Sequence, residues 1–125
     1  MRGISFWFLL TAAISVTVGM LWGILMSATT DHSMAPAHAH LNLIGWVTMA
    51  LFGFYYHLVP RAGERVVAKV QYAIATAGLL AIVPGIAMAI RGDGETLAKL
   101  GSVLTLLSML IFLYVVITGR DRQTA

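Results

Sequence analysis

The stretch AHAHLNLIGWVTMALFGFYYHLV, residues 37–59, decides the fold class, because it is apolar over most of its length and carries no Asp, Glu, Lys or Arg. A helix needs about 20 apolar residues to cross a hydrocarbon core of about 30 Å. Similar runs flank it, and together the four runs are Ile4–Ser27, Ala37–Val59, Val67–Ile90 and Leu97–Thr118. Backbone groups in lipid must pair within their own segment, so these runs predict an all-α bundle of four transmembrane helices.

Composition agrees with a membrane protein of one domain, residues 1–125. Hydrophobic residues make up 59% of the chain and charged residues 10%, whereas soluble domains carry about 25% charged residues. The chain has no cysteine, which excludes disulfides, thiolate metal sites and iron–sulfur clusters. A cleaved signal peptide is an alternative for the first run, but its apolar stretch is too long for one.

Basic residues predict the orientation, because they gather on the cytoplasmic side of membrane proteins. Both termini and the connection between the second and third runs carry most of them: Arg2, Arg61, Arg65, Lys69, Arg120 and Arg122. The other two connections hold Arg91 and Lys99, offset by Asp31, Asp93 and Glu95. We therefore expect both termini in the cytoplasm, in a bacterial-type inner (plasma) membrane. Because the basic residues lie at span ends, the net charge of +3 does not indicate nucleic-acid binding.

Small and aromatic residues predict packing surfaces. Small residues at four-residue spacing let helices approach closely in lipid, and two such ridges are present. The first is Ser15, Gly19, Gly23 and Ser27, and the second is Ala77, Ala81, Gly85 and Ala89. Aromatic residues near the inner span ends predict an interfacial belt of Trp7, Tyr55, Tyr56, Tyr72 and Tyr114.

Three of the four histidines lie near the outer end of the second run. Pro36 suits the first turn of a helix, since its missing N–H would be unpaired there anyway. His38 and His40 then point about 200° apart, so they cannot bind one metal from the same side. An ionisable residue at the depth of His40 is a functional hypothesis by default; the alternative is an imidazole bonded to a neighbouring helix or to water. His57 lies roughly 25 Å further along the helix, where an interfacial role is the simpler interpretation.

A metal site in the outer segment is a second interpretation. Imidazole and thioether groups suit copper, and the candidate ligands are His32, Met34, His38 and His40, with Asp31 nearby.

The segments HLNLIGW (residues 40–46) and FGFYYHLVP (residues 52–60) resemble the second transmembrane helix of subunit I in the haem–copper oxidase superfamily. The nearest likeness is to nitric oxide reductases and C-type cytochrome c oxidases, whose second helix begins near the outer face with His-x-Asn. That histidine is an axial ligand of the low-spin b-type haem, so the resemblance assigns this role to His40. It also implies that Asn42 is a polar group beside the ligand or at a helix contact, with Gly45 and Gly53 as room for the porphyrin. From the residues alone, these two glycines leave a flat strip for either a neighbouring helix or a planar cofactor.

The family's subunit has about twelve helices in three arcs of four, and this chain is similar to one arc. The resemblance therefore implies a homo-oligomer in the lipid bilayer, a homotrimer or a homodimer, in which two copies of His40 share one haem iron. Otherwise the second ligand would be His38, Met34 or His32. The family's other metal-binding histidines have no counterpart here, so one chain cannot form the complete oxidase site.

The expected function is that of a membrane-embedded haem b protein that transfers electrons to a redox partner or senses a diatomic gas. The alternatives are a protein that handles copper or another metal at its outer face, and a non-catalytic accessory subunit of a respiratory complex. Enzymatic activity is left open, since no serine, carboxylate-pair or phosphate-loop motif is present.

Overall fold

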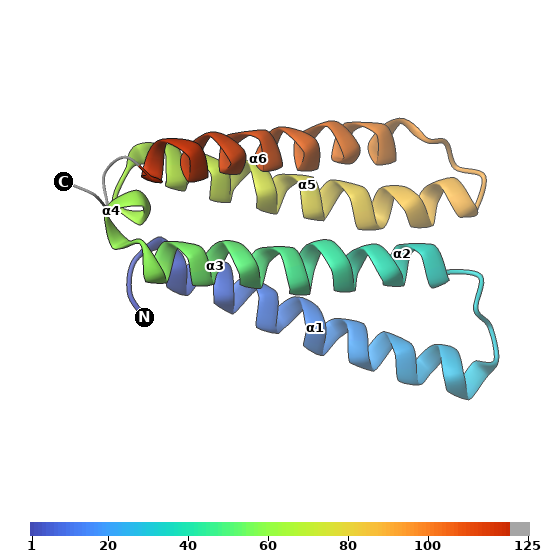
Figure 1. The fold of residues 1–125 in the computed structure, drawn as a ribbon. Coiled ribbons are helices and arrows are strands. Elements are labelled where there is room, and N and C mark those ends of the chain that lie inside the picture. Colours follow the sequence, from blue (N-terminus) through green and yellow to red (C-terminus); the bar gives the residue numbers. More distant parts are fainter. Residues whose placement is uncertain (121–125) are drawn as a thin grey trace.

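The computed structural model of the protein describes residues 1–120, which form helices and no strands (Figure 1). The elements are α1 (Ile4–Thr29), α2 (Ala35–His40), η1 (Leu41–Thr48), α3 (Met49–Leu58), α4 (Pro60–Gly63), α5 (Val66–Ile90) and α6 (Thr96–Arg120). Arg122 and the end of the predicted domain lie outside the described residues.

Three helices, α1, α5 and α6, are long and apolar enough to cross a membrane, and they support a multi-pass membrane protein. Their bounds agree closely with the first, third and fourth predicted runs. α1 ends where Thr30 adopts a left-handed conformation with φ of 56°, which stops the helical hydrogen bonding. α5 runs through Pro84 without interruption.

The second predicted run is not one regular α-helix. It begins as α2, with Pro36 in its first turn as predicted, continues as the π-helix η1, and returns to α-helix as α3. The Thr48 hydroxyl donates to the Leu43 carbonyl five residues earlier, at 2.8 Å, in keeping with the wider π turn.

The π turns explain which side of this stretch is buried. Its buried residues include Ala37, Leu41, Gly45, Met49 and Gly53, one every four residues. In an α-helix of 3.6 residues per turn, each four-residue step turns the side chain roughly 40° too far. A wider turn corrects this drift, so the stripe stays on the buried side along the whole stretch, where η1 and α3 pack on α1.

The helices form two hairpins whose connections lie at the same end of the bundle, opposite the termini and α4 (Figure 1). α1 packs on η1 and α3, whereas α6 packs mainly on α5. The predicted ridge of α1 lies in the first contact, where Ser15 and Gly19 are buried and Gly23 is half-buried. Ser27 is exposed, and Figure 1 shows α1 diverging from α2 towards this end.

The α5–α6 contact uses part of the predicted ridge, since Ala81 and Gly85 are buried, and adds Gly78 and Gly101. Ala77 is exposed, whereas Gly78 packs on Thr105 and Gly85 packs on Ala98. Gly101 of α6 lies so close to α5 that a Cβ added to Gly101 would be 2.5 Å from the backbone nitrogen of Ile82. Ridges from both helices therefore let the backbones touch, as small residues do in membranes.

An aromatic cluster joins the long helices near the end that holds the termini. Phe8 of α1 contacts Phe52 and Tyr56 of α3 and Tyr72 of α5, at ring-centroid distances of 5.0–5.6 Å. Phe52 in turn contacts Phe112 of α6 at 4.5 Å. Tyr56 is only 2% exposed, so its predicted place in an interfacial belt is wrong, and its hydroxyl donates to Gln71 at 2.7 Å instead. Burial of these rings holds the two hairpins together.

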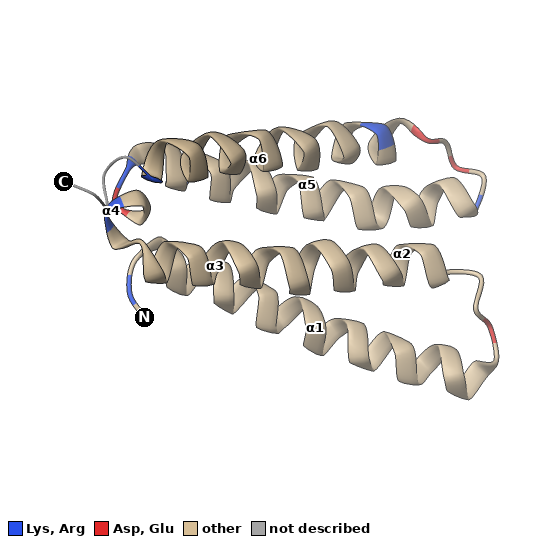
Figure 2. Ribbon diagram, in the orientation of Figure 1, with Lys and Arg blue, Asp and Glu red and all other residues tan. Residues whose placement is uncertain are grey.

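Charged residues separate to the two ends of the bundle (Figure 2). The end with the termini and α4 carries Arg2, Arg61, Arg65, Lys69 and Arg120, with Glu64 as its acidic residue within the described range. The opposite end carries Asp31, Arg91, Asp93, Glu95 and Lys99. The middle of the bundle is free of charge between these ends.

Candidate functional site

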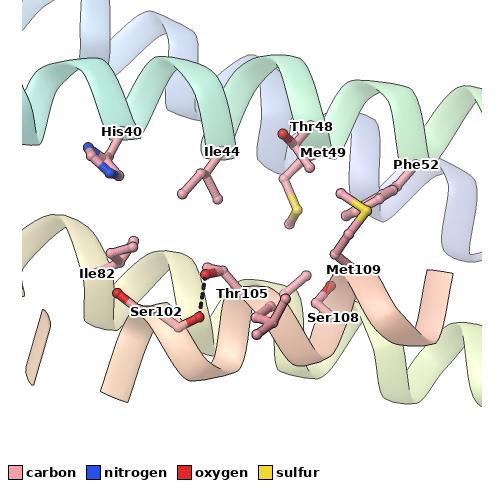
Figure 3. A pocket seen from close by; sticks show the side chains of 12 residues that line it. His40, Ile44, Thr48, Met49, Phe52, Ile82, Ser102, Thr105, Ser108 and Met109 are labelled. Atoms are coloured by element: carbon pink, nitrogen blue, oxygen red, sulfur yellow. Dashed lines mark hydrogen bonds between the residues drawn. The ribbon is translucent and has the colours of Figure 1, made fainter. Parts of the chain in front are cut away.

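A groove lies beside His40, the predicted haem ligand, and we call it the His40 groove (Figure 3). It lies between the α2–η1–α3 stretch on one side and α5 and α6 on the other. Its volume is about 370 Å³, within the range of small-molecule pockets. The lining residues are His40, Ile44, Thr48, Met49, Phe52, Ala75, Ile82, Ser102, Thr105, Leu106, Ser108 and Met109. The groove exists because α6 packs on α5 and contacts the second stretch little.

His40 is held by its own helix in a defined tautomer. Its Nδ1 lies 2.8 Å from the carbonyl oxygen of Pro36, one turn earlier. A carbonyl oxygen only accepts, so Nδ1 carries the hydrogen and donates it. In the neutral ring Nε2 is then left with its lone pair, and no hydrogen-bonding partner contacts it within residues 1–120. This tautomer and orientation are those that metal-binding histidines use.

Hydroxyl groups line the α6 side of the groove at three-residue spacing, which places them on one face of the helix (Figure 3). Ser102 donates to the Ala98 carbonyl at 2.9 Å, and Thr105 donates to the Ser102 carbonyl at 3.0 Å. Ser108 differs from both, because it is 2% exposed and its Oγ has no partner in the part of the chain described. A buried unpaired hydroxyl is costly, so this wall of the groove offers an unused polar atom.

His38 faces away from the groove and ties α2 to α1. Its Nε2 lies 2.9 Å from the Gly19 carbonyl and 3.2 Å from Nδ2 of Asn42. One ring nitrogen cannot donate and accept together, and the shorter contact favours donation to Gly19. The ring also meets the edge of Trp22 at 6.0 Å. The structure thus separates His38 from His40, as their two-residue spacing predicts.

Asn42, Gly45 and Gly53 also lie at the contact with α1 rather than in the groove. A Cβ added to Gly19 would collide with the Asn42 side chain, and one added to Gly45 would lie 2.8 Å from Ser15 Cβ and Oγ. A Cβ on Gly53 would lie 3.2 Å from Phe8 Cβ. These glycines therefore make room for α1, which is the neighbouring-helix alternative for them; for Asn42 the structure likewise favours the helix-contact alternative.

The candidate copper ligands are not brought together. His32 and Met34 lie in the segment before α2, His38 bonds to α1, and His40 faces the groove. Within residues 1–120, no group of three His, Cys, Asp or Glu side chains could hold a metal ion. Asp31 accepts a hydrogen bond from the Ser33 backbone N–H at 3.0 Å, and this bond lowers the pKa of its carboxyl group.

Sequence reasoning did not identify Thr48, Ser102, Thr105, Ser108 or the π-helix as parts of this site. The three-residue spacing of the α6 hydroxyls can be read from the sequence. It indicates a site only once the structure shows that this face of α6 lies opposite His40. Comparisons with protein-family models, curated proteins and solved structures found no match to this chain. The geometry of the His40 groove is therefore the main indication of function.

Proposed function

We propose that this chain crosses the membrane four times, with both termini in the cytoplasm, and that it binds haem b through His40. The α2–η1–α3 stretch would be the fourth crossing, since it is continuous over Ala35–Leu58 and is apolar between its histidines. The separation of basic and mixed charge at the two ends supports the orientation (Figure 2).

One observation carries the haem proposal: an imidazole with Nδ1 bonded to a carbonyl and Nε2 unpartnered beside an open groove. Neutral imidazole nitrogen is a common axial ligand of haem iron. The bond to the Pro36 carbonyl would hold the ring in place and raise the basicity of Nε2. When bound, haem supplies a one-electron redox centre or, with its sixth position open, a site for a diatomic gas.

The side chains around His40 suit an apolar planar group. Ile44, Met49 and Phe52 line the groove from the second stretch, and Ile82 and Leu106 line it from α5 and α6. These side chains would exclude water and contact the faces of the ring through dispersion.

One chain supplies one such imidazole, and the groove is open rather than enclosed. A second copy of the chain would complete the site by adding another His40 and covering the exposed edge. This arrangement accounts for the sequence resemblance to one four-helix arc. It predicts one haem for every two chains and a low-spin spectrum from two imidazole ligands.

The test is a reduced-minus-oxidised spectrum of the full chain purified from haem-replete cells, with a count of haem per chain. We expect a Soret band in the unaltered protein and in His32→Ala, a matched control because His32 is exposed and does not line the groove. His40→Ala should abolish the band. Absence of haem in the unaltered protein, or an unchanged band in His40→Ala, would reject the proposal.

A further inference from the structure

A second cavity lies at the opposite end of the bundle from His40, beside the start of α1. Its volume is about 400 Å³, and its polar lining groups are Arg2, Ser5, His57 and Glu64. Ile4, Tyr56 and Pro60 contribute apolar wall. The His40 proposal makes no use of this cavity or of His57.

Opposite charges face this cavity without neutralising each other. Arg2 and Glu64 both line it, yet neither forms an ion pair with any described residue. His57 is exposed and likewise makes no hydrogen bond within residues 1–120, so a ring N–H is available as a donor. The Ser5 hydroxyl donates to the Arg2 carbonyl at 2.7 Å and fixes the Arg2 backbone to the first turn of α1. The cavity therefore presents a guanidinium group, an imidazole N–H and a carboxylate.

The position of the cavity matches that of lipid headgroups. α1 begins at Ile4 and α3 ends at Leu58, so the cavity lies at the ends of two apolar helices. It belongs to the basic end of the bundle (Figure 2), and Arg61, Arg65 and Lys69 lie in or beside α4 and the start of α5 at this end. Basic pockets between helices on the cytoplasmic side are typical sites for phosphate-bearing headgroups.

The charge pattern selects among headgroups. A guanidinium binds a phosphate through paired N–H donors, and a carboxylate binds a primary ammonium group. A headgroup with phosphate alone would satisfy Arg2 and meet repulsion from Glu64. We propose that this cavity binds a zwitterionic phospholipid with a primary amine, phosphatidylethanolamine, with phosphate on Arg2 and His57 and ammonium on Glu64. The inference uses the membrane orientation proposed above and is independent of haem.

The test is native mass spectrometry of the full chain released from nanodiscs of phosphatidylcholine doped equally with phosphatidylethanolamine and phosphatidylglycerol. We expect one phosphatidylethanolamine retained per chain in preference to the other two lipids. Arg2→Gln should lower that retention roughly fivefold. Glu64→Gln should abolish the preference for phosphatidylethanolamine over phosphatidylglycerol. Arg120→Gln, at the same end but outside the cavity lining, should behave as the unaltered chain.

Three results would overturn the proposal. Equal retention of all three lipids by the unaltered chain would show that there is no specific site. Equal effects of Arg2→Gln and Arg120→Gln would show general attraction to the basic end. Displacement of the bound lipid by inorganic phosphate at millimolar concentration would identify a free-phosphate site, whereas resistance to it supports a lipid site. A chain that lacks haem but retains the lipid leaves this inference standing and rejects only the function proposed for His40.

Discussion

The two sides of the α2–η1–α3 stretch differ in whether the polar groups beside them are hydrogen-bonded. On the side facing α1, His38 bonds to the Gly19 carbonyl and Asn42 packs against the same glycine. On the side facing the His40 groove, Nε2 of His40 and Oγ of Ser108 have no partner among the described residues. Two histidines two positions apart are therefore used differently, one for helix packing and one exposed to a cavity. Unpaired polar atoms are costly in an apolar setting, so the groove is the side on which a ligand would lower the free energy.

The largest effect on stability should come from adding volume on the α1 side. Gly45→Leu places a Cβ 2.8 Å from Ser15 and forces α1 away, which we expect to destabilise the fold by up to about 3 kcal/mol. Thermal unfolding in detergent, followed by circular dichroism, would measure the loss. Ala39→Leu introduces the same side chain at an exposed position and should leave the midpoint unchanged. Equal midpoints for the two variants would contradict the packed side described here.

A smaller effect should follow from removing the imidazole on the packed side. His38→Ala deletes the hydrogen bond to Gly19 and the contact with Trp22, at a cost of about 1 kcal/mol. Any haem spectrum should remain, in contrast to His40→Ala. The same unfolding experiment and an absorption spectrum would measure both properties. If His38→Ala removed the Soret band and His40→Ala did not, the assignment of the two histidines would be reversed.

The smallest effect should come from the groove side. Ser108→Ala removes a buried hydroxyl that has no protein partner within residues 1–120, so its removal should be neutral or stabilising by up to about 1 kcal/mol in the ligand-free chain. Ser15→Ala is the matched control, because its hydroxyl is also buried but donates to the Thr11 carbonyl at 2.8 Å. A clear destabilisation by Ser108→Ala would mean that a ligand or ordered water bonds to this hydroxyl.

Much of the architecture was predictable, because burial in lipid demands long apolar helices. The first, third and fourth runs correspond to α1, α5 and α6, and the ridge from Ser15 to Gly23 is at a helix contact. The π-helix was not predictable in the same way. Residues 41–48 are apolar on most sides, so no polar face marked a change in the number of residues per turn.

The candidate site was only partly predictable for a related reason. His40 could be singled out, since it is an ionisable residue beside a long apolar run. The direction in which Gly45 faces could not, because a glycine can make room for a cofactor or for a helix equally well. Tyr56 was misplaced because tyrosine is typical of interfaces, whereas here Gln71 on α5 supplies a buried acceptor. Both outcomes depend on which helices are neighbours, and local sequence does not specify this.

The π-helical turns of η1 have a consequence for how the outer and inner halves of this stretch are coupled. A wide turn accommodates more residues than an α-helical turn, so a one-residue deletion within Leu41–Thr48 could be absorbed by a return to regular α-helix. Each residue of an α-helix contributes roughly 100° of rotation. Without such a deletion, a return to regular α-helix over the same residues would rotate α2 relative to α3 and carry the His40 ring out of line with the cavity wall, while the aromatic cluster below kept its register. The π turns of η1 therefore set the direction in which the His40 ring points, while the packing of α3 on α1 stays the same.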